Sequence, residues 1–158
     1  MKPTVDIETT IVSYLTAWPS RDVVRLTHES LTRQWWRFHR PSFELFTSNF
    51  VIEEASRGDP IAAAERLKEL AGIPMLPADP RVEDLAGEIV QAIALPVRAH
   101  VDAAHVAVAA VHGIRFLLTW NCTHLANGML TDKIEDTCER SGFRAPRILT
   151  PELLMELP

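Results

Sequence analysis

The fold is decided by the stretch Val101-Asp-Ala-Ala-His-Val-Ala-Val-Ala-Ala-Val-His-Gly-Ile-Arg-Phe-Leu-Leu-Thr-Trp-Asn121. Its first half is rich in alanine and small apolar residues, which predicts a helix packed tightly inside a domain. Gly113 stands where a helix C-terminus takes a left-handed residue, and residues 116–120 are typical of a short, fully buried parallel strand. Asp102 opens this helix and Asn121 ends this strand. On this stretch alone, Asp102 is either a charge favoured by the helix dipole or a ligand-binding group.

The totals describe an ordinary globular chain of 158 residues, and we expect a single domain over residues 1–158. No apolar run approaches the about 20 residues of a membrane span, and no signal-peptide pattern opens the chain, so we expect a cytoplasmic protein with no membrane partner. Cys122 and Cys138 lack metal-ligand spacing, which favours reduced thiols. The net charge of −5 excludes a global attraction to nucleic acid, so a polyanion would need a local basic patch or metal ions.

Strand-like and helical segments alternate along the chain. Thr9 or Thr10 is the expected N-cap of the first helix, and Ser48 is the expected N-cap of the third. The expected strands are 4–8, 43–47, 73–77, 116–120 and 147–150. The first expected helices are 11–17, 20–39, 49–57, 61–70 and 81–94, the last of these ended by Pro96. They are followed by the alanine-rich helix, a helix that reaches about Arg140 and a helical turn that begins at Pro151. This alternation predicts the α/β class, with three αβα layers and a central, mostly parallel sheet of four or five strands.

The most basic part of the chain is the helix expected over residues 20–39. It carries only two acidic residues, against the arginines Arg21, Arg25, Arg33 and Arg37, with Arg40 just beyond. Two interpretations stay open: an ordinary solvated helix face, or a surface that contacts RNA phosphates beside Trp35 and Trp36.

Carboxylates recur at one kind of position. Glu8 leaves the first strand, Glu54 lies on the helix after the second strand, and Asp102 starts the alanine-rich helix. In a parallel sheet these positions share one edge, where three carboxylates would repel one another unless a divalent cation neutralised them. Oxygen ligands without sulfur favour Mg²⁺ or Mn²⁺ over Zn²⁺. Glu53 and Glu54 point about 100° apart on a helix, so only one of them can face this edge.

Four segments together resemble a PIN-domain protein, close to the VapC-type toxin branch of type II toxin–antitoxin systems: Val5–Leu15, Thr47–Asp59, Asp102–Ala110 and Leu117–Leu125. The resemblance implies a PIN-like parallel sheet between helices and an acidic metal site that hydrolyses RNA. It also implies a cognate antitoxin as partner and a homodimer, for which the tryptophan-bearing helix is a candidate surface.

The resemblance also assigns residues. It places the acidic metal ligands at Glu8, Glu54 and Asp102, with Glu54 aligning better than Glu53. Thr10 falls where the family keeps a small polar residue beside the metal.

Asn121 departs from the family, which usually has Asp after this strand. A neutral amide can coordinate a cation through its oxygen or hydrogen-bond a water, but it adds no charge. The alternative is that catalysis has been lost at this position. Nearby His124 is either a proton donor or phosphate contact, or an ordinary surface residue. His105 and His112, one heptad apart, are expected to be packing or hydrogen-bonded residues.

The resulting hypothesis is a Mg²⁺-dependent endoribonuclease that leaves a 5′-phosphate and a 3′-hydroxyl, with bases stacking on Trp35, Trp36 or Trp120. The competing hypothesis is a PIN-like module with a weakened metal site that binds RNA or an antitoxin without turnover. A small-molecule hydrolase or phosphatase is disfavoured, because the chain has neither a Gly-rich phosphate loop nor a Gly-x-Ser-x-Gly elbow.

Overall fold

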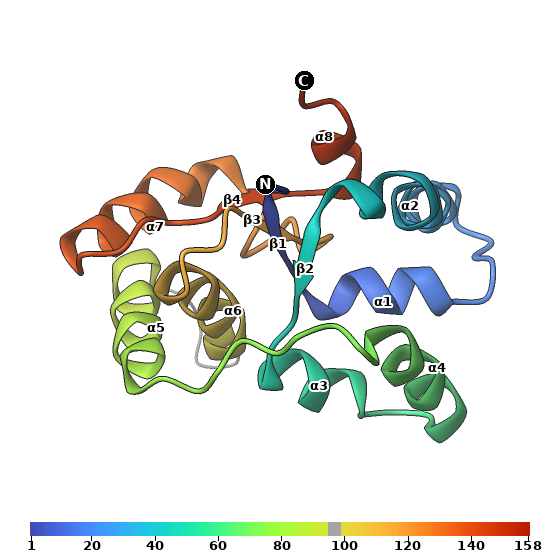
Figure 1. Cartoon of the computed structure of the whole chain (residues 1–158), viewed down its shortest axis with the longest axis horizontal. Helices are drawn as coiled ribbons and strands as arrows, with labels where there is room; N and C mark the ends of the chain where they lie inside the picture. Colours follow the sequence, from blue (N-terminus) through green and yellow to red (C-terminus); the bar gives the residue numbers. More distant parts are fainter. Residues whose placement is uncertain (95–98) are drawn as a thin grey trace.

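Four short parallel strands form the sheet at the centre of the molecule (Figure 1). The structure is a computed structural model that describes residues 1–94 and 99–158. The strands are β1 (Thr4–Ile7), β2 (Glu44–Phe46), β3 (Phe116–Leu118) and β4 (Arg147–Leu149), in the order β2-β1-β3-β4. In the central register, Val5 pairs with Leu45 on one side and with Phe116 on the other. The predicted α/β class with a parallel sheet is confirmed.

Helices cover both faces of the sheet, because alternate strand residues enter two different cores. Leu117 belongs to the core beneath one helix layer, whereas Phe116 and Leu118 belong to the core on the opposite face. The first layer is α5 (Pro80–Ile93), α6 (His100–Val111) and α7 (Gly128–Arg140), and the second is α1 (Thr9–Thr16), α2 (Val23–Gln34), α3 (Asn49–Ala55), α4 (Pro60–Leu70) and α8 (Pro151–Met155), as Figure 1 shows.

Helix α6 is the alanine-rich helix predicted from the sequence. Every residue from 103 to 110 is buried, and Gly113 after it has a φ of 65°. Small side chains on all sides let this helix lie between α5 and the sheet, which a bulkier helix would be too wide to do. Its first turn, with Asp102, therefore opens at the carboxyl edge of the strands.

Three local predictions need correction. Residues 73–77 are not a strand: only Met75 pairs, through an isolated bridge to Thr47, because Pro74 and Pro77 cannot donate to a ladder. The N-cap of α1 is Glu8 rather than a threonine. The basic helix is split into α2, a π-helical turn (Trp35–His39) and a 3₁₀ turn (Arg40–Ser42). The predicted helix end at Pro96 lies outside the described residues.

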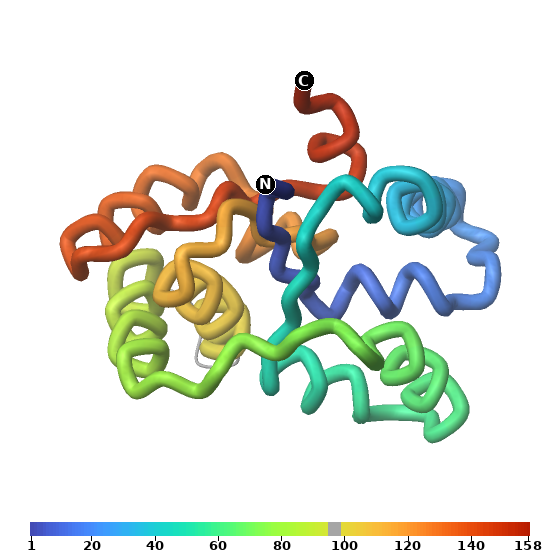
Figure 2. The backbone as a smooth tube through the Cα atoms, viewed as in Figure 1, coloured from blue at the N-terminus to red at the C-terminus, as the bar shows by residue number. Residues whose placement is uncertain are grey.

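The connections make a switch point at the centre of the sheet. From β1 the chain moves to β2 on one side, and it later returns to β3 on the other side of β1. Figure 2 traces this path, with the N-terminal strand between the two halves of the chain. Ligand sites of open parallel sheets lie at the carboxyl ends of strands next to such a switch. Among the described residues, no helix is both long and apolar enough to cross a membrane.

Candidate metal centre

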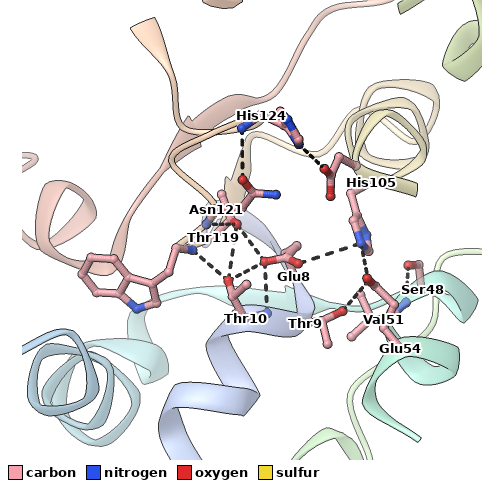
Figure 3. Close-up of polar contacts among 12 residues, drawn as sticks. Glu8, Thr9, Thr10, Ser48, Val51, Glu54, His105, Thr119, Asn121 and His124 are labelled. Atoms are coloured by element: carbon pink, nitrogen blue, oxygen red, sulfur yellow. Dashed lines mark hydrogen bonds and ion pairs between the residues drawn. The ribbon is translucent and has the colours of Figure 1, made fainter. Parts of the chain in front are cut away.

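Glu8 is fixed at the point where β1 becomes α1. Its Oε2 accepts hydrogen bonds from the backbone N–H and the hydroxyl of Thr10, and from the hydroxyl of Thr119 at 2.7 Å. The residue is only 3 % exposed. These donors hold Oε2, and Oε1 faces the imidazole of His105 at 3.9 Å (Figure 3). Glu8 therefore presents one oxygen to the site with the other already bound.

Glu54 reaches the same point from the second helix layer. Ser48 caps α3, its Oγ accepting from the N–H of Val51. The Oε1 of Glu54 accepts from the Thr9 hydroxyl at 2.7 Å and lies 2.6 Å from His105 Nε2. Burial opposes ionisation, but the hydrogen bonds and charge of His105 and the Thr9 hydroxyl outweigh it, so the pKa of Glu54 lies below its ordinary value. Its neighbour Glu53 is exposed to solvent.

His105 completes this group, although its sequence pattern indicated only packing or hydrogen bonding. It is fully buried, and its ring meets Phe50 edge-on. Burial lowers the pKa of His105, yet the hydrogen bond to Glu54 and the charges of Glu8, Glu54 and Asp6 raise it above its ordinary value. The available signal was its spacing: residues three apart on a helix share a face, so His105 follows Asp102 toward the carboxyl edge.

Glu8, Glu54 and His105 form what we call the inner cluster. One potential ligand atom from each lies within 4.8 Å of the others, so these three side chains could hold a divalent cation. Two carboxylates and one imidazole are a donor set that metal ions take, and the donor atoms converge from the β1–α1 junction, α3 and α6. The residues present fit a metal centre.

Asp102 and His124 form a second group, the outer pair. His124 Nδ1 lies 2.8 Å from Asp102 Oδ2, and both side chains are partly exposed. Asp102 was expected beside Glu8 and Glu54, but among the described residues the inner cluster takes His105 in its place. Figure 3 shows His124 and the inner cluster on either side of Asn121.

Asn121 organises the turn after β3. Its Oδ1 accepts from the backbone N–H groups of Thr123 and His124, at 3.2 and 3.0 Å. Its own N–H donates to the hydroxyl of Thr119, which in turn donates to Glu8. The amide oxygen that sequence analysis offered to a cation is thus engaged in the backbone of the turn.

Asp6 is a second polar residue missed by sequence analysis. It lies in the middle of β1, is fully buried, and neither of its carboxylate oxygens has a hydrogen-bond partner among the described residues. Burial, aided by the charge of Glu8 and opposed by that of His105, raises the pKa of Asp6 to about 7. The Nδ1 of His105 is also buried without a described partner.

The residues expected to contact substrate differ in their surroundings: some already have hydrogen-bond or ion-pair partners within the protein, and others are exposed. The hydroxyl of Thr10 is engaged by Glu8 and by the N–H of Trp120. Arg33 donates to the carbonyl of Ala17, and Arg25 lies 3.6 Å from the buried Glu29. Arg21 and Arg37 are exposed.

The tryptophans also differ in their surroundings. Trp35 and Trp120 are buried, which excludes both as platforms for base stacking, whereas Trp36 is partly exposed beneath Arg40. Trp120 instead ties α2 to the site. Its indole donates to Thr32 at 2.7 Å and stacks on His28 with ring centroids 4.1 Å apart.

Comparison with known proteins shows similarity in structure rather than in sequence. No protein-family model and no curated protein matches the chain. Its structure is similar to that of VapBC2 from Rickettsia felis bound to a DNA fragment from its promoter, with a TM-score of 0.58 and 12 % identity over 93 % of this chain and 98 % of that one. It is also similar to VapC20 from Mycobacterium tuberculosis, a sarcin-ricin-loop-cleaving toxin, with a TM-score of 0.50 and 18 % identity over 90 % and 99 % of the two chains. The chain therefore has the three-layer fold of VapC-type PIN-domain structures.

Proposed function

We propose that this protein is a divalent-metal-dependent endoribonuclease, the toxin of a toxin–antitoxin pair. The observation that carries the proposal is the inner cluster. A carboxylate at the end of β1 and one from α3 converge within 4.8 Å of one another and of a buried imidazole, beside the switch point of the sheet. The fold is shared with a toxin that cleaves the sarcin-ricin loop, which makes RNA the substrate we favour.

In this proposal Mg²⁺ or Mn²⁺ is held by the inner-cluster carboxylates Glu8 and Glu54, and Asp102 lies beside them at the same edge of the sheet. A bound divalent cation would supply an activated water and positive charge beside the scissile phosphate. Glu8 and Glu54 hold their carboxylates ready, because Thr9, Thr10 and Thr119 fix them by hydrogen bonds.

The remaining side chains act on the substrate. His124, oriented by Asp102, is placed to donate a hydrogen bond to a phosphate oxygen. Asn121 supports the catalytic edge by holding the turn that carries His124. Thr10 lines the site, and phosphates farther along the RNA contact the arginines of the basic helix: Arg21, Arg25, Arg33 and Arg37. Of these, Arg33 is the least free to move.

The partners in this proposal are RNA, a cognate antitoxin and a second copy of the chain. Helix α2 and the residues flanking it expose apolar side chains, with Val23 75 % and Val24 64 % exposed, which suits a protein interface. Both cysteines are free thiols, in keeping with the cytoplasm, where we expect the protein to act.

A second candidate function has an observation of its own. Asn121 is neutral and its oxygen is engaged in the turn, and Asp102 is paired with His124. A metal site weakened in this way would suit a non-catalytic module that binds RNA or an antitoxin.

Cleavage of RNA by the purified protein, with Mg²⁺ or Mn²⁺ and with EDTA, separates the two functions. We expect cleavage that requires the metal and falls at least about 100-fold in Glu8→Gln and Glu54→Gln. Glu53→Gln, an exposed change beside Glu54, is the matched control and should retain wild-type activity. Cleavage in EDTA, or cleavage unchanged in both variants, overturns the proposal. Binding of RNA without cleavage under any metal supports the non-catalytic module.

A further inference from the structure

The inference concerns His105 and rests on the proposed function. We propose that the imidazole of His105 is a direct nitrogen ligand of the metal centre, which makes the site selective for Mn²⁺ over Mg²⁺. Asp6 acts behind it as the positioning carboxylate. The inner cluster is then a mixed nitrogen–oxygen site rather than an all-carboxylate one.

The position of Nε2 is the first argument. It lies 3.9 Å from Glu8 Oε1 and 2.6 Å from Glu54 Oε1. Ligands bound about 2.0–2.2 Å from one ion lie about 2.9–4.3 Å from each other. The His105–Glu8 separation already falls in this range, and the His105–Glu54 separation needs to widen by only a few tenths of an ångström. An ion held between Glu8 Oε1 and Glu54 Oε1 would therefore have the ring nitrogen within coordination distance.

The surroundings of the ring are the second argument. A histidine that serves packing alone normally has both ring nitrogens satisfied when buried. His105 is fully buried, yet its Nδ1 has no described partner, and its Nε2 meets only carboxylates. The ring is held in this position because His105 lies in the middle of α6 and its imidazole packs edge-on against Phe50.

Asp6 is the third and independent observation. Its side chain is fully buried and both oxygens lack described partners, although it is close enough to His105 and Glu8 for their charges to act on it. Metal-binding histidines usually donate their second N–H to a carboxylate, which fixes the tautomer and the ring orientation. Asp6 is the buried carboxylate available for this purpose, and because neither of its oxygens contacts Nδ1 directly, a bridging water would make the link.

The donor set decides the metal. Mg²⁺ prefers oxygen ligands in a near-ideal octahedron, and imidazole favours transition metals. The expected oxygen ligand Asp102 is engaged by His124 and lies outside the inner cluster. With one nitrogen among three ligands, the centre should bind Mn²⁺ more tightly than Mg²⁺, because Mg²⁺ is the stricter of the two in requiring oxygen ligands.

The decisive measurement is pulsed electron paramagnetic resonance of the full-length protein loaded with Mn²⁺. Wild-type protein should show ¹⁴N modulation from a directly bound nitrogen, and selective labelling with ¹⁵N-histidine should convert it to ¹⁵N modulation. His105→Gln keeps the size of the side chain and offers an oxygen, so it should abolish the nitrogen signal and reduce the Mn²⁺-over-Mg²⁺ affinity ratio at least about tenfold. His112→Gln, at the C-cap of α6, is the matched control and should leave both unchanged. Asp6→Asn should keep the nitrogen signal and weaken Mn²⁺ affinity about 10–100-fold.

The outcomes separate this inference from the function beneath it. If Mn²⁺ binds but shows no histidine nitrogen, or if the signal vanishes in His124→Gln and persists in His105→Gln, the inference fails while the metal-dependent nuclease stands. If neither metal binds at millimolar concentration, the proposed nuclease fails together with it. The labelled wild-type measurement shows histidine ligation without any variant, and a signal that persists in His124→Gln then assigns it to His105 even if His105→Gln does not fold.

Discussion

The inner cluster and the outer pair lie at the same edge of the sheet but differ in burial and in the number of carboxylates that face each histidine. In the inner cluster, two carboxylates share one buried imidazole, with a third buried carboxylate, Asp6, close by. In the outer pair, a single carboxylate meets a single histidine, and both are partly open to solvent. The outer pair has one histidine for one carboxylate, whereas the inner cluster has one histidine for two carboxylates. The excess of carboxylates over histidines is therefore local to the inner cluster.

The largest expected effect comes from removing the excess charge behind the inner cluster. The pKa of Asp6 is raised from an ordinary 3.8 to about 7, so its protonated form is favoured by folding. Its contribution to stability is complete below about pH 4 and is lost as the pH rises through 7, a change on the order of 4 kcal/mol. Asp6→Asn mimics the protonated form and should be more stable than wild type by this order at pH 8, with little difference at pH 4.

Urea denaturation in EDTA at pH 4 and pH 8 measures this difference. If wild type and Asp6→Asn differ in stability by the same amount at both pH values, the pKa of Asp6 is not raised by burial.

The next effect contrasts the two groups directly. Glu54→Gln removes a charge from the inner cluster, and Asp102→Asn removes one from the outer pair. Substitution of a residue that only hydrogen-bonds to a metal ligand typically weakens metal binding about 10–100-fold. We expect Glu54→Gln to weaken Mn²⁺ binding by more than this, and Asp102→Asn to weaken it by about tenfold or less. Calorimetric titration of both variants checks the ranking, and equal losses would merge the two groups into one site.

A smaller effect is expected when charge is added between the groups. Asn121→Asp keeps the oxygen that accepts from Thr123 and His124, so the turn should be preserved. The additional charge should raise metal affinity or cleavage rate about three- to tenfold. An unchanged affinity and rate would mean that the neutral residue suffices at this position.

The smallest effect is expected from breaking the outer pair. His124→Asn should cost at most about 1 kcal/mol of stability, because the pair is partly exposed and solvent screens it. Thermal unfolding measures this cost. A loss of several kcal/mol would mean that the turn after β3 depends on the pair for its stability.

Sequence periodicity predicted the sheet and its carboxyl edge, because both depend on patterns repeated along the chain. The alanine-rich helix, the buried strand after it and the convergence of Glu8 and Glu54 follow from such patterns. The partner of Asp102 does not, since it depends on how the turn after β3 folds back over α6. That turn brings His124 to Asp102 and leaves His105, one turn deeper, to face the other carboxylates. Propensity also mispredicted residues 73–77, where two prolines leave only a single bridge.

One carboxylate serves two unrelated purposes, and this affects what its presence in other chains can reveal. Glu8 begins α1 by accepting the N–H of Thr10, and a residue in that position is worth about 1 kcal/mol to a helix. Without any bound metal, the first helix would still need a side chain at position 8 that accepts this N–H. Glu54 lies inside α3, whose N-cap is Ser48, so it starts no helix, and its hydrogen bonds go to Thr9 and His105 at the inner cluster. In related chains, a carboxylate at position 54 would therefore be a more specific sign of a metal site than a carboxylate at position 8, which also caps a helix.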